Sequence, residues 1–390
     1  MNAKIQSVIG ANAGRSRSHN RQVVLGHIKT TGPMGRAQIA RASGLSTQAV
    51  SNIIADLLDD GFLREDGRLS TGRGLPAVQY ALNPKGGFAF GVEIRPDAIF
   101  AALLNLEGRA LFSRREALSR TDPKWVRDRV VALRDAALAE TGVQTARVLG
   151  AGLVLPGPFG TTGLTDAGSE LPGWQQVDAA TWFAQGLDLA VYVENDANAT
   201  AMAERVSGAA QGFETYAFLY FGTGLGLGLV SQGRLIRGAF GNAGEIGHIP
   251  VPGPLGPVAL EQAVSRLSAQ KHLKDHGITA DSIADLDQLF QARSPALCAW
   301  LEKTRQPLGH ALTTIENLFD PQTIILGGAM PDAILDDLIV NAALSPQSVA
   351  NRPDRTTPRL IRGASGRMTA ALGAAALVIN QSFTPEIAAA

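Results

Sequence analysis

The chain has 390 residues, enough for two or three domains of about 100–200 residues each. Its 45% apolar and 18% charged residues exclude a disordered or fibrous protein, and its single cysteine, Cys298, excludes a disulfide framework and a cysteine-rich zinc cluster. Without an apolar run of about 18 residues or a secretory leader, we expect a cytoplasmic protein with no membrane span.

The zero net charge hides an asymmetry along the chain. Residues 1–80 carry ten Lys and Arg against five Asp and Glu, so the remainder carries the opposite excess. A basic head on an acidic body fits a polyanion partner at one end, although a solvated basic face would give the same count.

The first 83 residues are typical of a DNA-binding head. Residues 1–19 are polar and without period, which predicts a flexible basic arm. Helical patterns then follow from Asn20 to the Gly32-Pro33 stop, over Arg36–Ala42 and over Thr47–Asp59, and two strands at 62–65 and 78–82 flank a basic tip. This order predicts a winged helix-turn-helix over 20–83.

The third helix keeps a polar outer face that could read DNA bases. Phosphate contacts are expected from Arg21, Arg36, Arg41 and the arm, and Arg73 lies at the tip of the wing. The predicted DNA-binding residues are Arg36, Thr47, Gln48, Ser51, Asn52 and Arg73. The alternative is a small helical adaptor that never contacts DNA.

From about Pro84 the pattern changes to strands with interleaved helices, which predicts an α/β body of two lobes. The expected strands are 88–94, 98–104, 148–154, 190–193, 216–221, 226–231 and 323–326, and the expected helices are 124–141, 197–207 and 305–318.

Two glycine-rich turns follow expected strands. The run Gly222-Thr223-Gly224-Leu225-Gly226 fits a phosphate cradle, because glycine lets the backbone approach a ligand closely, but it also fits an ordinary tight turn. Gly327-Gly328 is open to the same two interpretations.

Polar clusters carry more information. Asn195 and Asp196 follow a strand and open a helix, where open α/β sheets place ligand contacts, although a helix N-cap explains them equally well. Glu245 and His248 lie in a glycine-rich loop, and a structural role is the simpler explanation for the histidine. Together, such side chains suit a sugar, because each hydroxyl both donates and accepts hydrogen bonds.

These segments resemble the ROK family (repressors, open reading frames, kinases) of the actin-like, ribonuclease-H-like sugar kinase fold. The resemblance rests on VENDANATAMAERVSG at 193–208, FLYFGTGLGLGLVSQGRLIRGAFGNAGEIGH at 218–248, GLVLPGP at 152–158 and DPQTIILGG at 320–328. The preceding winged helix matches the repressor branch, which includes xylose- and N-acetylglucosamine-responsive members. The resemblance implies a sensor domain over 84–390, with one lobe over 84–192 plus the C-terminal helix and the other over 193–375.

The resemblance also implies site residues. The sugar contacts would be Asn195, Asp196, Glu245, His248 and Glu261, and in a kinase Asp196 would be the general base. The nucleotide loops would use Gly222, Thr223, Gly224, Gly226, Gly327 and Gly328.

Two departures from the family pattern matter. The first phosphate hairpin of the kinases, Asp-x-Gly-x-Thr, is here Glu93-Ile94-Arg95-Pro96-Asp97, so we expect no useful kinase activity and no ATP or magnesium cofactor. The zinc-binding cysteines of the family are absent from 249–261, so we expect no metal, and the shorter loop leaves the position of Glu261 open.

The sequence therefore predicts a sugar-responsive repressor that binds operator DNA as a homodimer or tetramer. Two alternatives remain: an ATP-dependent kinase of a hexose or N-acetylhexosamine with a DNA-binding appendage, and a DNA-binding module whose body binds a protein.

Overall fold

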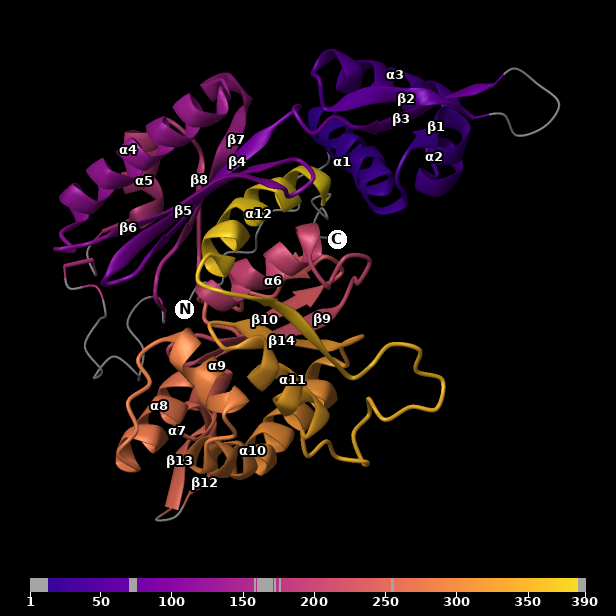
Figure 1. Cartoon of the computed structure of the whole chain (residues 1–390). Helices are drawn as coiled ribbons and strands as arrows, with labels where there is room; N and C mark the ends of the chain where they lie inside the picture. The colour runs from indigo at the N-terminus through magenta and orange to yellow at the C-terminus, as the bar shows by residue number, and fades with distance from the viewer. Residues whose placement is uncertain are drawn as a thin grey trace, which may run out of the picture.

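The computed structural model describes residues 13–69, 76–157, 159, 171, 173–174, 177–253 and 256–384. A small head and a two-lobed body make up the molecule, and the last helix lies between the two lobes with one end beside the head (Figure 1). In the described part of the chain, no helix is both long and apolar enough to cross a membrane.

The head contains three helices and a three-stranded sheet in the order β1-β3-β2. Its elements are α1 (Ala13–Thr31), β1 (Met34–Gly35), α2 (Arg36–Ser43), α3 (Thr47–Asp59), β2 (Leu63–Leu69) and β3 (Ala77–Leu82). The predicted third helix is confirmed residue for residue. Ser46 caps it by accepting a hydrogen bond from the Ala49 amide, and its inner face buries Val50, Ile53 and Leu57.

The first helix corrects one prediction, because it begins at Ala13 and not at Asn20. The arm predicted over 1–19 is therefore wrong from residue 13 onward. Arg17 forms an ion pair with Asp56 at 2.6 Å and Arg21 forms one with Asp60, so polar contacts to α3 extend the helix. Such contacts leave no apolar period in the sequence.

The first lobe is built on a sheet in the order β6-β5-β4-β7-β8. Its strands are β4 (Phe88–Ile94), β5 (Ala98–Asn105), β6 (Ala110–Ala117), β7 (Val148–Val154) and β8 (Val191–Glu194), and its helices are α4 (Pro123–Thr141) and α5 (Ala179–Leu187). The boundary predicted between residues 192 and 193 falls inside β8, which pairs with β7 through Glu194. The first sheet therefore ends at Glu194, where the strand gives way to a helix.

The second lobe repeats this topology in the order β11-β10-β9-β14-β15. Its main elements are α6 (Asp196–Ser207), β9 (Tyr216–Phe221), β10 (Leu225–Ser231), β11 (Arg234–Leu235), β14 (Ile324–Gly328) and β15 (Leu360–Ser365). Below this sheet lie β12 (Pro250–Gly253), β13 (Gly256–Ala259), α7 (Leu260–Ala263), α8 (Arg266–Asp275), α9 (Ile283–Gln291), α10 (Pro295–Phe319) and α11 (Asp332–Val340). In each sheet, antiparallel strands are followed by parallel ones, which confirms the predicted two-lobed α/β body.

The final helix, α12 (Thr369–Phe383), packs against the first sheet and against α6. Glycines allow these close approaches. A β-carbon at Gly152 would overlap the Ala374 carbonyl oxygen, and one at Gly373 would overlap the Ala199 carbonyl oxygen. Backbone-to-backbone packing of this kind transmits small shifts of either lobe to α12.

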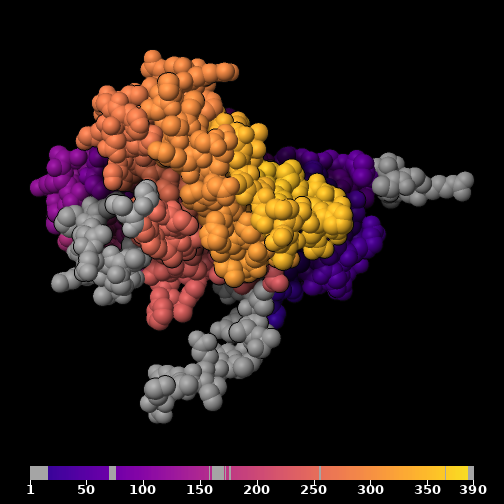
Figure 2. Space-filling model, turned by 90° about the horizontal axis from the view of Figure 1, so that it is seen from below, coloured from indigo at the N-terminus to yellow at the C-terminus, as the bar shows by residue number. Residues whose placement is uncertain are grey.

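The C-terminal end of α12 lies beside α1 of the head (Figure 1). The Gln22 side-chain amide donates to the Gln381 carbonyl at 2.8 Å, and Lys29 lies 4.6 Å from the centre of the Phe383 ring. A second contact joins the head to the first lobe, where the Arg147 guanidinium donates to the Asp60 carbonyl at 2.7 Å. The head, indigo in Figure 2, forms one end of the molecule.

Candidate functional site

The site begins where β8 passes into α6. Asn195 is the N-cap of α6, and its side chain accepts a hydrogen bond from the Asn198 amide at 2.8 Å. The N-cap role that the sequence allowed is therefore real. Asp196, the first residue of the helix, stays partly exposed while Asn195 is buried.

The glycine-rich turn between β9 and β10 passes directly in front of Asp196. A β-carbon at Gly222 would lie 3.3 Å from Asp196 Oδ2, and one at Gly226 would lie 3.9 Å from Oδ1. At Gly224 a β-carbon would overlap the Glu261 carboxylate. The turn therefore lies against the carboxylates of Asp196 and Glu261 and borders the predicted site.

Glu245, His248 and Glu261 form one cluster. His248 Nε2 lies 3.6 Å from Glu245 Oε2, and His248 Nδ1 lies 3.8 Å from Glu261 Oε1. The three side chains are each about one third exposed, at 32%, 33% and 31%. Burial raises the pKa of Glu245, the nearby imidazole lowers it, and the Glu261 charge raises it.

The structure thus brings Glu261 to the other predicted sugar residues despite the shortened loop. The proline-rich segment before it forms the β12–β13 hairpin, in which Pro250 pairs with Ala259. Gly157 lies next to two of these residues, since a β-carbon there would lie 3.8 Å from Glu245 Oε1 and 4.0 Å from the Asn195 β-carbon.

A polar network that the sequence did not reveal supports the passage from β8 into α6, with Glu194 buried and Arg237 half-exposed. Glu194 forms an ion pair with Arg237 and accepts a hydrogen bond from the Asn198 side chain at 2.9 Å. Asn198 Oδ1 is buried without a hydrogen-bond partner. The network fixes the residues on both sides of Asn195 and Asp196, and no spacing in the sequence indicates that Arg237 takes part.

The first lobe contributes the turn between β4 and β5 to this site. The Arg95 side chain donates to Glu93 at 2.5 Å and lies 4.7 Å from the centre of the Phe100 ring. Burial raises the pKa of Glu93 to about 7, although the arginine lowers it. Burial lowers the pKa of Arg95, whereas the nearby charges of Glu93, Tyr220 and Asp196 raise it above its usual value.

The second glycine turn closes β14. Gly328 has a φ of +111°, and a β-carbon there would lie 2.8 Å from the Phe221 carbonyl oxygen. Its carbonyl accepts a hydrogen bond from the Gly366 amide at 3.0 Å. Gly327 and Gly328 therefore join the end of β9 to the segment just before α12, whether or not a nucleotide binds there.

The predicted DNA-binding residues lie on the head. Thr47, Gln48 and Asn52 are exposed on α3, Ser51 is half-buried, and the Gln48 amide donates to Asn52 Oδ1 at 3.1 Å. Arg36 begins α2 and lies 5.0 Å from the centre of the Tyr80 ring. Arg73 lies outside the described residues.

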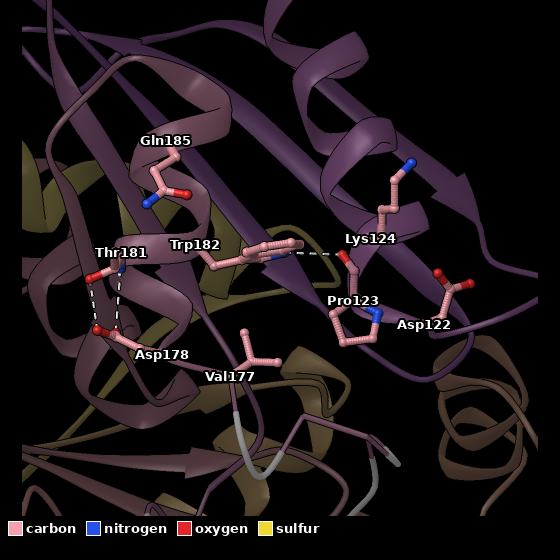
Figure 3. A pocket seen from close by; sticks show the side chains of 8 residues that line it. All are labelled: Asp122, Pro123, Lys124, Val177, Asp178, Thr181, Trp182 and Gln185. Carbon is pink, nitrogen blue, oxygen red and sulfur yellow. Dashed lines mark hydrogen bonds between the residues drawn. The ribbon is translucent and has the colours of Figure 1, made fainter.

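A cavity of about 530 Å³ lies elsewhere, on the first lobe between the starts of α4 and α5 (Figure 3). Its lining residues are Asp122, Pro123, Lys124, Val177, Asp178, Thr181, Trp182 and Gln185. The Trp182 indole donates to the Pro123 carbonyl at 3.4 Å, and Thr181 donates to Asp178. None of the predicted site residues lines this cavity.

A bound metal ion needs several His, Cys, Asp or Glu side chains around one point. Across the described ranges, no three His, Cys, Asp or Glu side chains are arranged to hold a metal ion.

Residues 89–381 match the model of the ROK family. Among curated proteins, the chain is 25% identical to the xylose repressor of Bacillus spizizenii over 93% of this chain and 95% of the relative. It is also 25% identical to the DNA-binding transcriptional dual regulator NagC of Escherichia coli, over 84% of each chain.

Solved structures agree with this assignment. A ROK family transcriptional regulator, a homologue of the E. coli Mlc protein, superposes with a TM-score of 0.72 over 95% of this chain and 97% of its own, at 22% identity. The ROK family glucokinase from Streptomyces griseus, solved with glucose and AMPPNP, superposes with a TM-score of 0.56 over 75% of this chain and 99% of its own, at 25% identity. These neighbours confirm the predicted actin-like sugar kinase fold.

Proposed function

Because the chain belongs to the ROK family, we propose that it is a sugar-responsive transcriptional repressor in which α3 binds operator DNA and the cleft binds a sugar. The observation that carries the proposal is the length of the match. A kinase neighbour covers 75% of the chain, whereas the xylose repressor covers 93%, so the repressor match extends into the head.

The sugar would bind against Asn195, Asp196, Glu245, His248 and Glu261. Carboxylate and amide groups suit it, because each accepts or donates at a fixed angle to a hydroxyl. Three of these side chains are about one third exposed and point toward one another, so they remain accessible to a ligand.

The structural change caused by sugar binding would be transmitted to the DNA-binding head through α12. Its packing on the first sheet and on α6 couples it to both walls of the cleft, and its end contacts α1. A cavity of about 520 Å³ borders this joint and is lined by Lys29, Arg205 and Phe383 among others, which leaves the head room to move. By linkage, the sugar must bind the DNA-free arrangement more tightly to release the operator.

We propose that the cleft performs no useful phosphoryl transfer. Arg95 occupies the place where kinases of this fold carry the glycine of the first phosphate hairpin, and it is anchored by Glu93 and Phe100. Phosphoryl transfer depends on positioning, so a side chain filling this place blocks the terminal phosphate of ATP. Neither ATP nor zinc is then a cofactor, since the zinc-binding cysteines are replaced by the β12–β13 hairpin.

The protein would act in the cytoplasm as a homodimer or tetramer, presenting two heads to a roughly palindromic operator. The test is fluorescence anisotropy on labelled DNA from upstream of its own gene, titrated with and without a panel of sugars. We expect tight DNA binding that one sugar weakens about tenfold, and no ATP turnover with any sugar of the panel. Turnover of ATP with a hexose or N-acetylhexosamine would favour the kinase instead.

A further inference from the structure

The loop that follows β11, residues 236–244, is a closed arm of the second lobe, and we call it the bridging loop. Its two ends are attached to β10: the Ile236 amide donates to that strand at 2.8 Å, and the Leu227 amide of the strand donates to the last carbonyl of the loop at 3.1 Å. Within the loop, the Ala243 amide donates to the Arg237 carbonyl at 3.1 Å. These three backbone hydrogen bonds fix the shape of the loop.

Two side chains of the bridging loop cross to the first lobe. Arg237 forms an ion pair with Glu194 at the end of β8. Asn242 contacts the segment that follows β7, where its Oδ1 accepts from the Phe159 amide at 2.8 Å and its Nδ2 donates to the Phe159 carbonyl at 2.9 Å. An asparagine side chain can satisfy a backbone N–H and a backbone C=O together, because it carries both an acceptor and a donor. The loop therefore joins the ends of two neighbouring strands of the first sheet.

The contact between Asn242 and Phe159 lies beside the proposed sugar site. Gly157 is two residues before Phe159, and a β-carbon there would lie 3.8 Å from Glu245 Oε1 and 4.0 Å from the Asn195 β-carbon. Glu245 directly follows the bridging loop. One short stretch of the second lobe thus carries a sugar residue and the side chain that holds the first lobe opposite it.

Polar contacts, and not apolar packing, hold the bridging loop to the first lobe. Residues 236–240 are exposed, and Phe240 at the tip of the loop is 88% exposed, so little apolar surface is buried there. Exposed polar contacts of this kind exchange with water at a small net cost. A ligand that lies between the lobes can therefore shift the balance between the joined and the separated arrangement.

We propose that Asn242 is a positioning residue of the sugar site, which holds the first-lobe segment at Gly157 against the sugar-binding residues of the second lobe. This inference rests on the proposed function and adds a residue to the five proposed sugar contacts. A sugar between Gly157 and Glu245 binds more tightly while the Asn242–Phe159 pair is intact. By linkage, the bound sugar also strengthens that pair.

The first test needs no sugar. Hydrogen exchange of the full chain is followed by mass spectrometry on peptides that contain Phe159, where Pro156 and Pro158 contribute no amide hydrogen. Asn242→Ala should raise the exchange rate of the Phe159 amide at least tenfold. Asn242→Asp should do so as well, because a carboxylate cannot donate to the Phe159 carbonyl.

The second test is the anisotropy assay on DNA with hexoses, pentoses and N-acetylhexosamines as probes. For the sugar that releases DNA from the wild type, both Asn242 variants should need at least tenfold more sugar for half-release. Their DNA affinity without sugar and their maximal release should stay within twofold of the wild type. In the exchange experiment, the same sugar should protect the Phe159 amide at least threefold in the wild type and not in Asn242→Ala.

A matched asparagine elsewhere in the second lobe provides the control. The Asn351 side chain donates to the Pro346 carbonyl at 2.9 Å in an exposed segment. Asn351→Ala should leave the exchange of the Phe159 amide and the sugar response unchanged. Thermal melts show whether each variant folds.

The outcomes separate this inference from the proposed function. If Asn242→Ala exposes the Phe159 amide but responds to sugar at the wild-type concentration, the contact is only structural and the positioning role is wrong, while the repressor proposal stands. An unchanged exchange rate would also overturn the role, and so would a loss of maximal release without a shift in the concentration for half-release. A wild type that responds to no sugar of the panel would refute the proposed function and this inference with it.

Discussion

The joint between α1 and α12 offers the sharpest perturbation of the signalling path. Gly26 lies in the middle of α1, where a β-carbon would lie 2.9 Å from the Phe383 carbonyl oxygen. Glycine inside a helix costs about 1 kcal/mol relative to alanine, so the close approach to α12 explains its presence. A larger side chain at this position must separate the head from the body.

The magnitude depends on the size of the new side chain. Gly26→Ala needs a shift of about 0.5 Å to reach ordinary contact and gains about 1 kcal/mol of helix propensity, so it should be close to neutral. Gly26→Leu places branched carbons against a backbone carbonyl that cannot yield, and such overpacking costs about 1–3 kcal/mol. That is comparable to the 1.4 kcal/mol of a tenfold sugar response.

The assay is anisotropy on operator DNA with and without the effector. We expect Gly26→Leu to bind DNA while its sugar response falls from about tenfold to under about twofold. Calorimetry should then show the head melting apart from the body. Ser18→Leu, on the exposed side of α1, is the control and should behave like the wild type. A full sugar response in Gly26→Leu would refute the role of the joint.

Four further predictions follow from the same structure. Alanine at both Gln48 and Asn52 should weaken binding to the operator far more than binding to unrelated DNA, because these exposed amides of α3 can form hydrogen bonds to base edges. A competition assay measures both affinities, and equal losses on the two DNAs would contradict base readout. Asp196→Asn should abolish the sugar response and leave DNA affinity within about twofold, as measured by anisotropy; an intact response would remove Asp196 from the site. Gly152→Ala should lower the free energy of unfolding by about 1–3 kcal/mol in urea titrations, since its β-carbon would overlap the Ala374 carbonyl, and an unchanged midpoint would contradict the packing of α12 on β7. Burial, and then the Arg205 charge, lower the pKa of Lys29 from 10.5 to about 8. Between these two pH values the unfolded chain binds one proton more than the folded chain, so the free energy of unfolding of the wild type should rise with pH across that window. Lys29→Met should be more stable than the wild type by about 2–3 kcal/mol at pH 7, and denaturation curves at pH 7 to 10 should show no such rise for this variant.

The strands that the sequence predicted most accurately are those buried on both faces. Phe88–Ile94, Val148–Val154 and Tyr216–Phe221 match the observed bounds, because a central strand reads as a short continuous apolar run. The third head helix was equally clear, since one face packs and the other stays polar.

The last helix was predicted only from the family resemblance. Ala370, Ala374 and Leu377 all lie buried, and almost every side of α12 contacts protein, so the sequence shows no amphipathic period. Its role as a link depends on glycines in other elements, such as Gly152, that allow close approach. A pattern read along one segment cannot reveal such a contact.

The candidate site likewise contains some residues that the sequence reveals and others that only the fold brings together. Asn195, Asp196, Glu245 and His248 lie in short motifs that the sequence shows directly. The ion pair between Glu194 and Arg237 does not, because the two residues are far apart in the chain and only the fold brings them together. The sequence shows Arg95 as a departure from the kinase hairpin, but it gives no signal for Arg237.

The measurement that tests the central claim most directly is anisotropy of the full chain on DNA from upstream of its own gene, titrated with the panel of sugars and their monophosphates. The account predicts tight DNA binding that a single ligand of the panel weakens about tenfold, a coupling of about 1.4 kcal/mol between cleft and head. Tight DNA binding that no sugar or sugar phosphate changes would contradict it, and would assign the body to a protein partner instead.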